Sequence, residues 1–345
     1  MKIIKKILNR CKREITNLSK KINVYTTDKK NFDKSKLHVK TTGFWEVINQ
    51  NFFELSFVHA LQKVIKSKDS KNQIQHTSYK PDIEFFSVFS KPDKINHSNA
   101  KVKIFYTGED VKYNYSDFSD LLLNKADLSI GFDYPEDINA NNYIRYPYWL
   151  LCYFGYTEDK DKIKKEVDWF NARTNNPERF CSFIARHDDD GFRKRMIDIV
   201  NKVETVSCAG AAYHNDDTLK TQFNDDKIEY LSHFMFNLCP ENISVKGYTT
   251  EKLFQSYAAG CIPIYSGSEG KPEEFINTKT IVMYNGNNEE EVIEQIKLLR
   301  DDEKYYNEFI KQPRLFDNAV DCIYDMNKNL RLKYEDIITT KLLNK

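Results

Sequence analysis

The fold is decided by the segment Phe236-Asn237-Leu238-Cys239-Pro240-Glu241-Asn242-Ile243-Ser244-Val245-Lys246-Gly247-Tyr248-Thr249-Thr250-Glu251-Lys252, which runs from an apolar stretch through a polar loop into a helical pattern. Gly247 allows the backbone to turn, and Thr249 or Thr250 can cap the helix. Apolar residues then recur at helical spacing up to Gly260, and Cys261-Ile262-Pro263-Ile264-Tyr265 follows as a second apolar stretch. This order predicts a strand, a loop, a helix and a second strand, which is the repeating unit of an α/β sheet.

The polar loop lies where such a sheet binds ligands. In an open α/β sheet, ligands lie beyond the carboxyl ends of the strands, and the N–H groups at a helix start favour an anion. Lys252 in the first helical turn opposes the helix dipole, so its charge suits a phosphate better than it suits the helix. The pattern alone also fits any βα unit with a polar loop.

The same segment resembles the donor-binding signature of the α1,3/1,4-fucosyltransferases, glycosyltransferase family 10, in which E-N-S, G-Y-x-T-E-K and I-P-I-Y follow in that order. Three upstream stretches are similar to the family's F-Y-T-G-E, I-G-F-D and Y-x-R-x-P motifs: Phe105-Tyr106-Thr107-Gly108-Glu109, Ile130-Gly131-Phe132-Asp133 and Tyr143-Ile144-Arg145-Tyr146-Pro147. Residues 180–185, with Arg193 a short loop later, are similar to the first strand of the donor domain. The resemblance covers roughly residues 40 to 325 and is to the soluble bacterial type.

This resemblance implies the GT-B architecture, which consists of two facing Rossmann-like α/β domains, here with a basic N-terminal helix. It implies an inverting glycosyltransferase that moves fucose from GDP-fucose to a hydroxyl of a glycan acceptor, forming an α1,3 or α1,4 fucoside. No cofactor is required in this scheme, and a divalent metal would at most be stimulatory. The implied site residues are Glu109 as catalytic base, Arg193 and Lys252 on the diphosphate, Glu251 on the sugar or ribose, and Asn242 and Tyr248 on the nucleotide.

The chemistry agrees with these roles. Cleavage of a nucleotide sugar at its anomeric carbon requires a base for the incoming hydroxyl and positive charge for the departing diphosphate. Glu109 follows the apolar stretch 102–106 at a Thr-Gly turn, from which a carboxylate can project into an interdomain cleft. Arg193 and Lys252 can supply the positive charge.

Some of these positions have simpler interpretations from the residues alone. Outside the family, Glu109 is a solvated turn acid, Asn242 a turn residue and Tyr248 a core residue. Neighbouring side chains also compete for two of the roles, namely Arg186 and Arg195 for that of Arg193, and Asp110 for that of Glu109.

Two other functions stay open. Asp188-Asp189-Asp190 satisfies the D-x-D pattern by which metal-dependent glycosyltransferases hold a divalent cation, so a metal-dependent enzyme with another sugar donor is one alternative. A glycan-binding protein that keeps the fold without turnover is the other. The chain also departs from the family at Pro240, where Phe is common, and at Ser266, where Trp is common. The motifs therefore favour the class of GDP sugars more strongly than they favour fucose as the transferred sugar.

Composition agrees with a globular enzyme of two domains. The chain has 345 residues, of which 40% are hydrophobic and 30% charged. Seven scattered cysteines without C-x-x-C pairs argue against a disulfide framework or a zinc site and for a reducing compartment. No apolar stretch approaches the roughly 20 residues of a membrane span, and no signal peptide is legible. We therefore expect a cytoplasmic enzyme whose partners are a GDP-sugar donor and a glycan or glycoconjugate acceptor, not nucleic acid.

The N-terminal tail is basic. Residues 1–40 hold 13 Lys and Arg against 3 Asp and Glu, a net charge of +10. Within residues 1–22, apolar residues follow a helical stripe with cations on the other faces: Ile3, Ile4, Ile7, Leu8, Cys11, Ile15, Leu18 and Ile22. Such a helix could lie on an anionic membrane surface, so peripheral membrane contact is one hypothesis, and docking on its own protein or on a partner is the other.

These landmarks predict five segments. The tail covers residues 1–36 and an acceptor-side α/β domain covers residues 37–165. The charged stretch 166–178 is expected to be a linker, residues 179–325 the nucleotide-sugar donor domain, and residues 326–345 a C-terminal helix that crosses back to the first domain.

Overall fold

The computed structural model describes residues 20–44, 53–67 and 73–343. The chain forms two compact units. Unit 1 comprises residues 1–130, 140–143 and 330–345, and unit 2 comprises residues 131–139 and 144–329. The expected α/β class with two Rossmann-like units is confirmed, because each unit is organised around a sheet of parallel strands.

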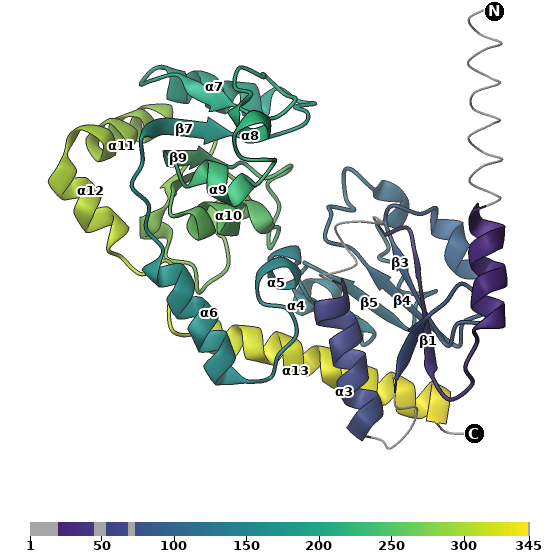
Figure 1. Ribbon diagram of the computed structural model, residues 1–345. Coiled ribbons are helices and arrows are strands. Elements are labelled where there is room, and N and C mark those ends of the chain that lie inside the picture. Colours follow the sequence, from purple (N-terminus) through teal and green to yellow (C-terminus); the bar gives the residue numbers. More distant parts are fainter. Residues whose placement is uncertain (1–19, 45–52, 68–72, 344–345) are drawn as a thin grey trace, which may run out of the picture. The chain divides into compact units, whose positions relative to one another are not determined.

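The first sheet has six strands in the order β2-β1-β3-β4-β5-β6 (Figure 1). Pairing from β2 through to β5 is parallel throughout. All five residues of β3 and all four of β5 are buried, as expected for strands of a sheet covered on both faces. The strands are β1 Leu37–Thr42, β2 Ile74–His76, β3 Ile83–Ser87, β4 Val102–Tyr106, β5 Leu128–Gly131 and β6 Tyr143–Arg145.

Aromatic and aliphatic side chains form the core of unit 1. Helix α3, His59–Ser67, follows a π-helical turn and buries Ala60, Leu61, Val64 and Ile65 at helical spacing. Phe53 and Phe57, just before it, lie against Phe85 of β3 with ring centroids 4.8 and 5.9 Å apart. These contacts fix the middle of the sheet, from which the loop after β4 emerges.

Part of the N-terminal tail belongs to unit 1. Residues 20–30 are helical and mostly exposed, and Ile22 is 56% exposed. The Asp28 carboxylate accepts hydrogen bonds from the Ser78 N–H and hydroxyl, and the Phe32 ring stacks on the His38 ring at 4.0 Å. The expected boundary at residue 36 is therefore wrong, because residues 28–36 are anchored on the unit. The rest of the expected apolar stripe, residues 3–18, lies outside the described residues.

The second sheet has the order β11-β10-β9-β7-β8 and is parallel throughout. Read from its first strand β7, this is the doubly wound order 2-1-3-4-5, and β2-β1-β3-β4-β5 of the first sheet repeats it. In such a sheet the chain winds outward in opposite directions from the first and third strands. The strands are β7 Arg179–Phe183, β8 Val206–Cys208, β9 Phe234–Leu238, β10 Ile262–Tyr265 and β11 Val282–Met283.

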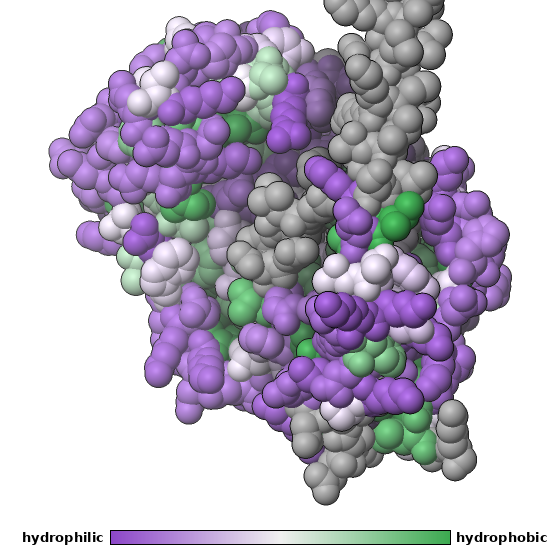
Figure 2. All heavy atoms as spheres, turned by 45° about the vertical axis from the view of Figure 1, so that its right-hand side comes forward, coloured by the Kyte–Doolittle hydropathy of each residue, from purple (hydrophilic) through white to green (hydrophobic). Residues whose placement is uncertain are grey.

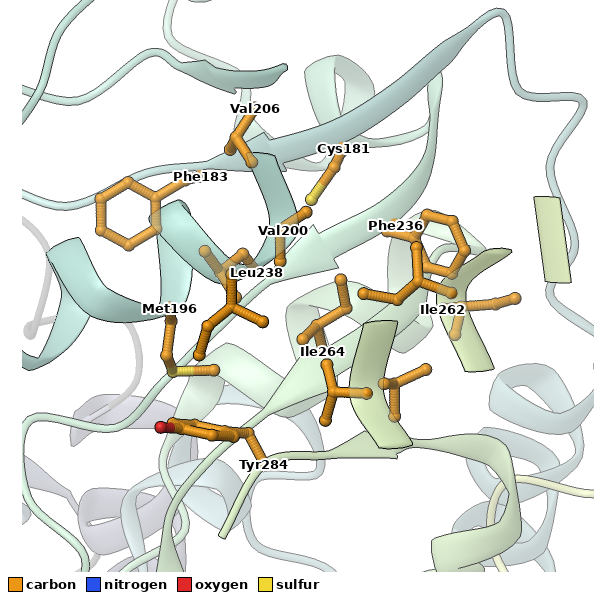
Figure 3. Packing of buried hydrophobic residues seen from close by; sticks show 14 of the residues in the cluster. Cys181, Phe183, Met196, Val200, Val206, Phe236, Leu238, Ile262, Ile264 and Tyr284 are labelled. Atoms are coloured by element: carbon orange, nitrogen blue, oxygen red, sulfur yellow. The ribbon is translucent and has the colours of Figure 1, made fainter. Parts of the chain in front are cut away.

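Apolar side chains of this sheet pack against helix α7, Phe192–Asn201. Phe183, Leu238 and Ile264 form one cluster with Met196 and Val200 of α7 (Figure 3). Val292, Ile296 and Leu299 of helix α11, Glu289–Asp301, join the same cluster. A second cluster includes Tyr230 and Leu231 of α9, Lys227–Leu231, together with Ala259 of α10.

Helix α10, Glu251–Ala259, begins and ends as its sequence predicts. Thr250 stands at its N-cap position and Gly260 at its C-cap position, in the left-handed conformation with φ of +85°. A side chain at position 260 would meet the backbone of Thr174 at 2.6 Å, so glycine is required there. The other helices are α4 Pro135–Ile138, α5 Tyr148–Tyr153, α6 Lys160–Ala172, α8 Thr218–Thr221, α12 Glu303–Ile310 and α13 Ala319–Ile338.

Three expected boundaries differ from the structure. The expected linker 166–178 contains most of α6, because Ile163, Val167 and Phe170 recur at helical spacing and are buried. Residues 144–165 belong to unit 2 rather than to the first domain. The C-terminal helix begins at Ala319 rather than at residue 326, and residues from 330 onward return to unit 1 as expected.

The surface is predominantly polar in the view of Figure 2. Hydrophilic side chains cover most of the described surface there, and hydrophobic residues show as small separate areas. Among the described helices, none is both long and apolar enough to span a bilayer.

Candidate functional site

The site residues predicted for unit 2 lie in the loop 239–250 and in the first turns of helices α7 and α10, after two neighbouring strands of its sheet. Arg193 follows β7, and the loop from Cys239 to Thr250 follows β9. Strands β7 and β9 are neighbours, and the chain leaves them in opposite directions. The carboxyl ends of two such strands form the crevice in which doubly wound sheets bind ligands.

Arg193 bridges the loop that follows β7 and the loop that follows β9. Its guanidinium donates a hydrogen bond of 2.7 Å to the side-chain oxygen of Asn242 and a second bond to the backbone carbonyl of His187. The alternative residues Arg186 and Arg195 are both exposed. Two residues that the sequence could assign only separately, Arg193 and Asn242, are thus in direct contact.

Asp188 holds the start of helix α7 and therefore the backbone of Arg193. Its carboxylate accepts hydrogen bonds from the N–H of Arg193 at 3.2 Å and of Lys194 at 2.8 Å, and from the hydroxyl of Tyr213 at 2.8 Å. Burial raises the pKa of Asp188, but the bonds from Tyr213 and the two N–H groups outweigh it and bring this pKa below its ordinary value. Sequence reasoning missed this role.

The loop with three aspartates is thus used for helix capping in the structure. Asp190 accepts from the N–H of Phe192 at 3.0 Å, in the same turn as Asp188. Over the described part of the chain, no group of three or more His, Cys, Asp or Glu side chains is placed to hold a metal ion.

Lys252 and Glu251 occupy the first turn of α10. The Lys252 ammonium donates to the Glu241 carboxylate at 2.9 Å and to the Thr250 hydroxyl at 3.0 Å, and its side chain is 23% exposed. Glu251 lies within electrostatic range of Cys152 of α5. Burial first, and then the charge of Glu251, raises the pKa of that thiol.

Glu241 is a residue of this loop that sequence reasoning did not single out. Its side chain is fully buried, and besides Lys252 it accepts hydrogen bonds from the Thr250 N–H at 2.7 Å, the Thr250 hydroxyl at 2.6 Å and the Tyr265 hydroxyl at 3.3 Å. A side chain at Gly267 would come within 2.5 Å of Glu241, so glycine makes room for it. The sequence signal that could have indicated it is its position, because Glu241 is an acidic residue between the apolar end of β9 and Asn242.

Tyr248 lies in the core of unit 2. It is 1% exposed, and its ring packs against Phe132 with centroids 4.9 Å apart. This is the position that the residue pattern alone indicated, and a role of Tyr248 in nucleotide binding stays a prediction. Phe132 comes from the stretch similar to I-G-F-D, so this upstream motif packs against Tyr248 of the loop 239–250.

A buried ion pair also supports this loop. Arg145 donates to Glu273 at 2.6 Å and to the carbonyl of Gly247 at 3.3 Å, and the Trp149 indole donates to the same Glu273 oxygen at 2.8 Å. The Arg145 guanidinium also lies 4.5 Å from the centre of the Tyr134 ring. These contacts explain why residues 131–139 and 144–153 belong to unit 2.

In unit 1, Glu109 lies in the loop after β4. The Thr107 hydroxyl accepts from the Glu109 N–H at 3.0 Å and donates to the Glu109 carbonyl at 2.7 Å, which fixes the backbone at this residue. Glu109 is partly exposed. Burial first, and then the charge of Glu109, raises the pKa of Tyr115, so the carboxylate and this phenol share one loop environment.

Asp110, the competing carboxylate, is engaged by its own loop. It is 1% exposed and accepts from the N–H groups of Lys112, Tyr113 and Asn114 at 3.1, 2.9 and 3.0 Å. These bonds commit the Asp110 carboxylate to the backbone of its own loop. The assignment of the catalytic base to Glu109 stays a prediction.

The geometry of unit 2 suits an anion. Arg193 and Lys252 stand in the first turns of α7 and α10, the helices that follow the parallel strands β7 and β9. A guanidinium and an ammonium in such a crevice can bind the oxygens of a diphosphate and stabilise negative charge that develops on it.

Two family models match the chain. The model described as the N-terminal domain of α-(1,3)-fucosyltransferase FucT matches residues 48–153, and that described as the C-terminal part of glycosyltransferase family 10 (fucosyltransferase) matches residues 173–323. The first match extends through α5, which the structure assigns to unit 2.

Individual proteins agree with these matches. The α-(1,3)-fucosyltransferase FucT of Helicobacter pylori is 28% identical over 280 residues, which cover 73% of this chain and 55% of that protein. An α-(1,4)-fucosyltransferase of Arabidopsis thaliana is 33% identical over 82 residues, or 23% of this chain and 20% of that protein. The chain thus spans about half of the H. pylori protein.

Solved structures show the same fold. An α1,3-fucosyltransferase crystallised with GDP superposes with a TM-score of 0.57 at 22% identity, over 88% of this chain and 94% of that one. The structure of an α1,3-fucosyltransferase with GDP-fucose gives a TM-score of 0.55 at 23% identity, over 86% and 90% of the two chains.

Proposed function

We propose, from the premise that the chain belongs to glycosyltransferase family 10, that it transfers fucose from GDP-fucose to a hydroxyl of a glycan acceptor. One observation supports this most: Arg193 is bonded to Asn242 beyond the carboxyl ends of β7 and β9, with Lys252 in the first turn of the helix that follows β9. The relatives named above are fucosyltransferases, and one neighbouring structure contains GDP-fucose.

The proposed step is a direct displacement. The acceptor oxygen forms a bond to the anomeric carbon as the bond from that carbon to the diphosphate oxygen breaks, so the configuration inverts. Glu109 takes the proton of the acceptor hydroxyl, and the electron pair of the broken bond leaves on GDP. Arg193 and Lys252 stabilise the charge that develops on the diphosphate, and no metal is required for this.

The acceptor is proposed to be a glycan or glycoconjugate, joined through an α1,3 or α1,4 linkage. Exposed aromatic rings of unit 1 support a sugar ligand: Tyr113 in the loop after β4 is 58% exposed, and Phe89 after β3 is 39% exposed and packs edge-on against Tyr115 at 5.7 Å.

Binding and transfer test the proposal separately. Calorimetric titration with GDP, UDP and CDP is expected to show a preference for GDP, and equal or stronger binding of UDP would overturn the donor assignment. Labelled GDP-fucose on an array of glycans is then expected to label specific acceptors. GDP binding without transfer or donor hydrolysis would instead favour a non-catalytic glycan-binding protein.

A further inference from the structure

The Lys252 ammonium, in the first turn of α10, is held by two neighbouring groups. It forms a closed triangle with the Glu241 carboxylate and the Thr250 hydroxyl, with distances of 2.9 Å between Lys252 and Glu241, 3.0 Å between Lys252 and Thr250, and 2.6 Å between Thr250 and Glu241. The Thr250 hydroxyl donates to Glu241 and accepts from Lys252, so all three groups have fixed roles. The cation therefore has a set position when the donor is absent.

The two oxygens of Glu241 have different partners. One oxygen accepts from the Thr250 N–H and the Tyr265 hydroxyl, which joins the start of α10 to the end of β10. The other accepts from the Thr250 hydroxyl and the Lys252 ammonium. The first pair of contacts holds the fold, and the second pair holds the cation.

We infer that Glu241 is a positioning residue of the donor site, which acts on a nucleoside diphosphate through Lys252. This inference rests on the proposed function. Lysine has a flexible stem, and a lysine without a fixed partner loses rotamer freedom when it binds an anion. The buried carboxylate orders the ammonium before the diphosphate arrives, at the cost of opposing part of its charge.

The charge and shape of glutamine make Glu241→Gln the informative change. Its amide has one acceptor oxygen, so the NH₂ group must face either the Lys252 ammonium or the donors on the opposite side. In either orientation Lys252 loses its charged partner and one set of donors loses its acceptor, while most of the volume is kept. We expect GDP to bind about tenfold more weakly, a change of the size that ordering one lysine side chain can produce, and guanosine to bind as in the wild type.

A double-mutant cycle separates positioning from a general loss of structure. In a Lys252→Met background, Glu241→Gln is expected to change the GDP affinity less than about twofold, because the group through which it acts is gone. Asp216→Asn is the matched control, because Asp216 is also a buried carboxylate of unit 2 with a cationic partner. It pairs at 2.6 Å with Arg179, which is the first residue of β7. It is expected to lower stability without changing GDP affinity in either background.

Each outcome decides the point. An equal loss of GDP affinity in both backgrounds, or tighter GDP binding by Glu241→Gln, overturns the positioning role. If Glu241→Gln does not yield folded protein, Thr250→Val and Thr250→Ser are compared instead. Positioning requires that Val weakens GDP binding only when Lys252 is present and that Ser restores it, and any other pattern overturns the role. A wild-type protein that does not prefer GDP over UDP would refute the proposed donor and not the positioning geometry.

Discussion

Replacing Asp188 with alanine distinguishes a capping residue from a metal ligand. In the structure this carboxylate accepts three hydrogen bonds, two from the first turn of α7 and one from Tyr213. Removing a helix cap costs about 1 kcal/mol, and removing the charged acceptor of the Tyr213 bond costs about 1 kcal/mol more at this partly exposed position. We therefore expect Asp188→Ala to lower the free energy of unfolding by about 2 kcal/mol, and Tyr213→Phe by about half as much.

The loss is expected to depend on pH. Because the folded pKa of Asp188 lies below its ordinary value of 3.8, the ionised group stabilises the folded state. That contribution is fully present above the unfolded pKa and is lost as the pH falls through the folded pKa. The stability difference between wild type and Asp188→Asn, measured by urea unfolding, should therefore shrink as the pH is lowered below about 4.

The same variants test the consequence for the donor. Fraying of the first turn of α7 displaces the backbone of Arg193, so we expect GDP affinity to fall in Asp188→Ala with or without chelator. If Asp188→Ala leaves stability unchanged, and wild-type activity disappears in chelator and returns with manganese, the capping argument is refuted and the metal-dependent alternative is correct.

Three further predictions concern the catalytic groups and the tail. Glu109→Gln keeps the size of the side chain but removes the base, so turnover should fall by roughly 10² to 10⁴ with little change in GDP affinity, and near-normal turnover would mean that another group takes the proton. Lys252→Ala should lose both GDP affinity and rate, whereas exhaustive chelation of the wild type should leave the rate unchanged; dependence on added manganese would contradict this. Deletion of residues 1–19, which spares Asp28 and Phe32, should abolish sedimentation with anionic vesicles and leave transfer to a soluble acceptor intact, whereas vesicle binding by the truncated protein would exclude this segment as the membrane contact.

The strands and helices that border the donor loop could be predicted from the sequence because local signals agree there. The apolar run before Cys239, the glycine at 260 and the periodic apolar residues of α10 all indicate the same elements, and the structure confirms each of them. The helix across the expected linker was missed because its charged residues outweigh three buried ones, and only the spacing of Ile163, Val167 and Phe170 reveals it.

The partners of the site residues could not be predicted in the same way. The bond from Arg193 to Asn242 joins residues 49 positions apart, and the Arg145–Glu273 pair joins residues 128 apart. No local pattern specifies such pairs, because they depend on the order of the strands in the sheet. Glu241 was missed for a related reason, since an acid in a polar loop is normally solvated and its burial follows from the approach of Gly267 and Tyr265 on the neighbouring strand's end.

Arg193 of α7 and Lys252 of α10 have different hydrogen-bond partners, and these partners decide how each cation can act on a diphosphate. The Arg193 guanidinium donates to two neutral oxygens, those of His187 and Asn242, and the Asp188 carboxylate acts on its charge only through space. Lys252 is bonded to a fully buried carboxylate, which fixes its position but opposes its field. A rigid planar guanidinium needs less ordering than a flexible ammonium, so a countercharge is useful only for the lysine. A diphosphate placed against both would then obtain most of its uncompensated charge from Arg193 and most of its fixed geometry from Lys252.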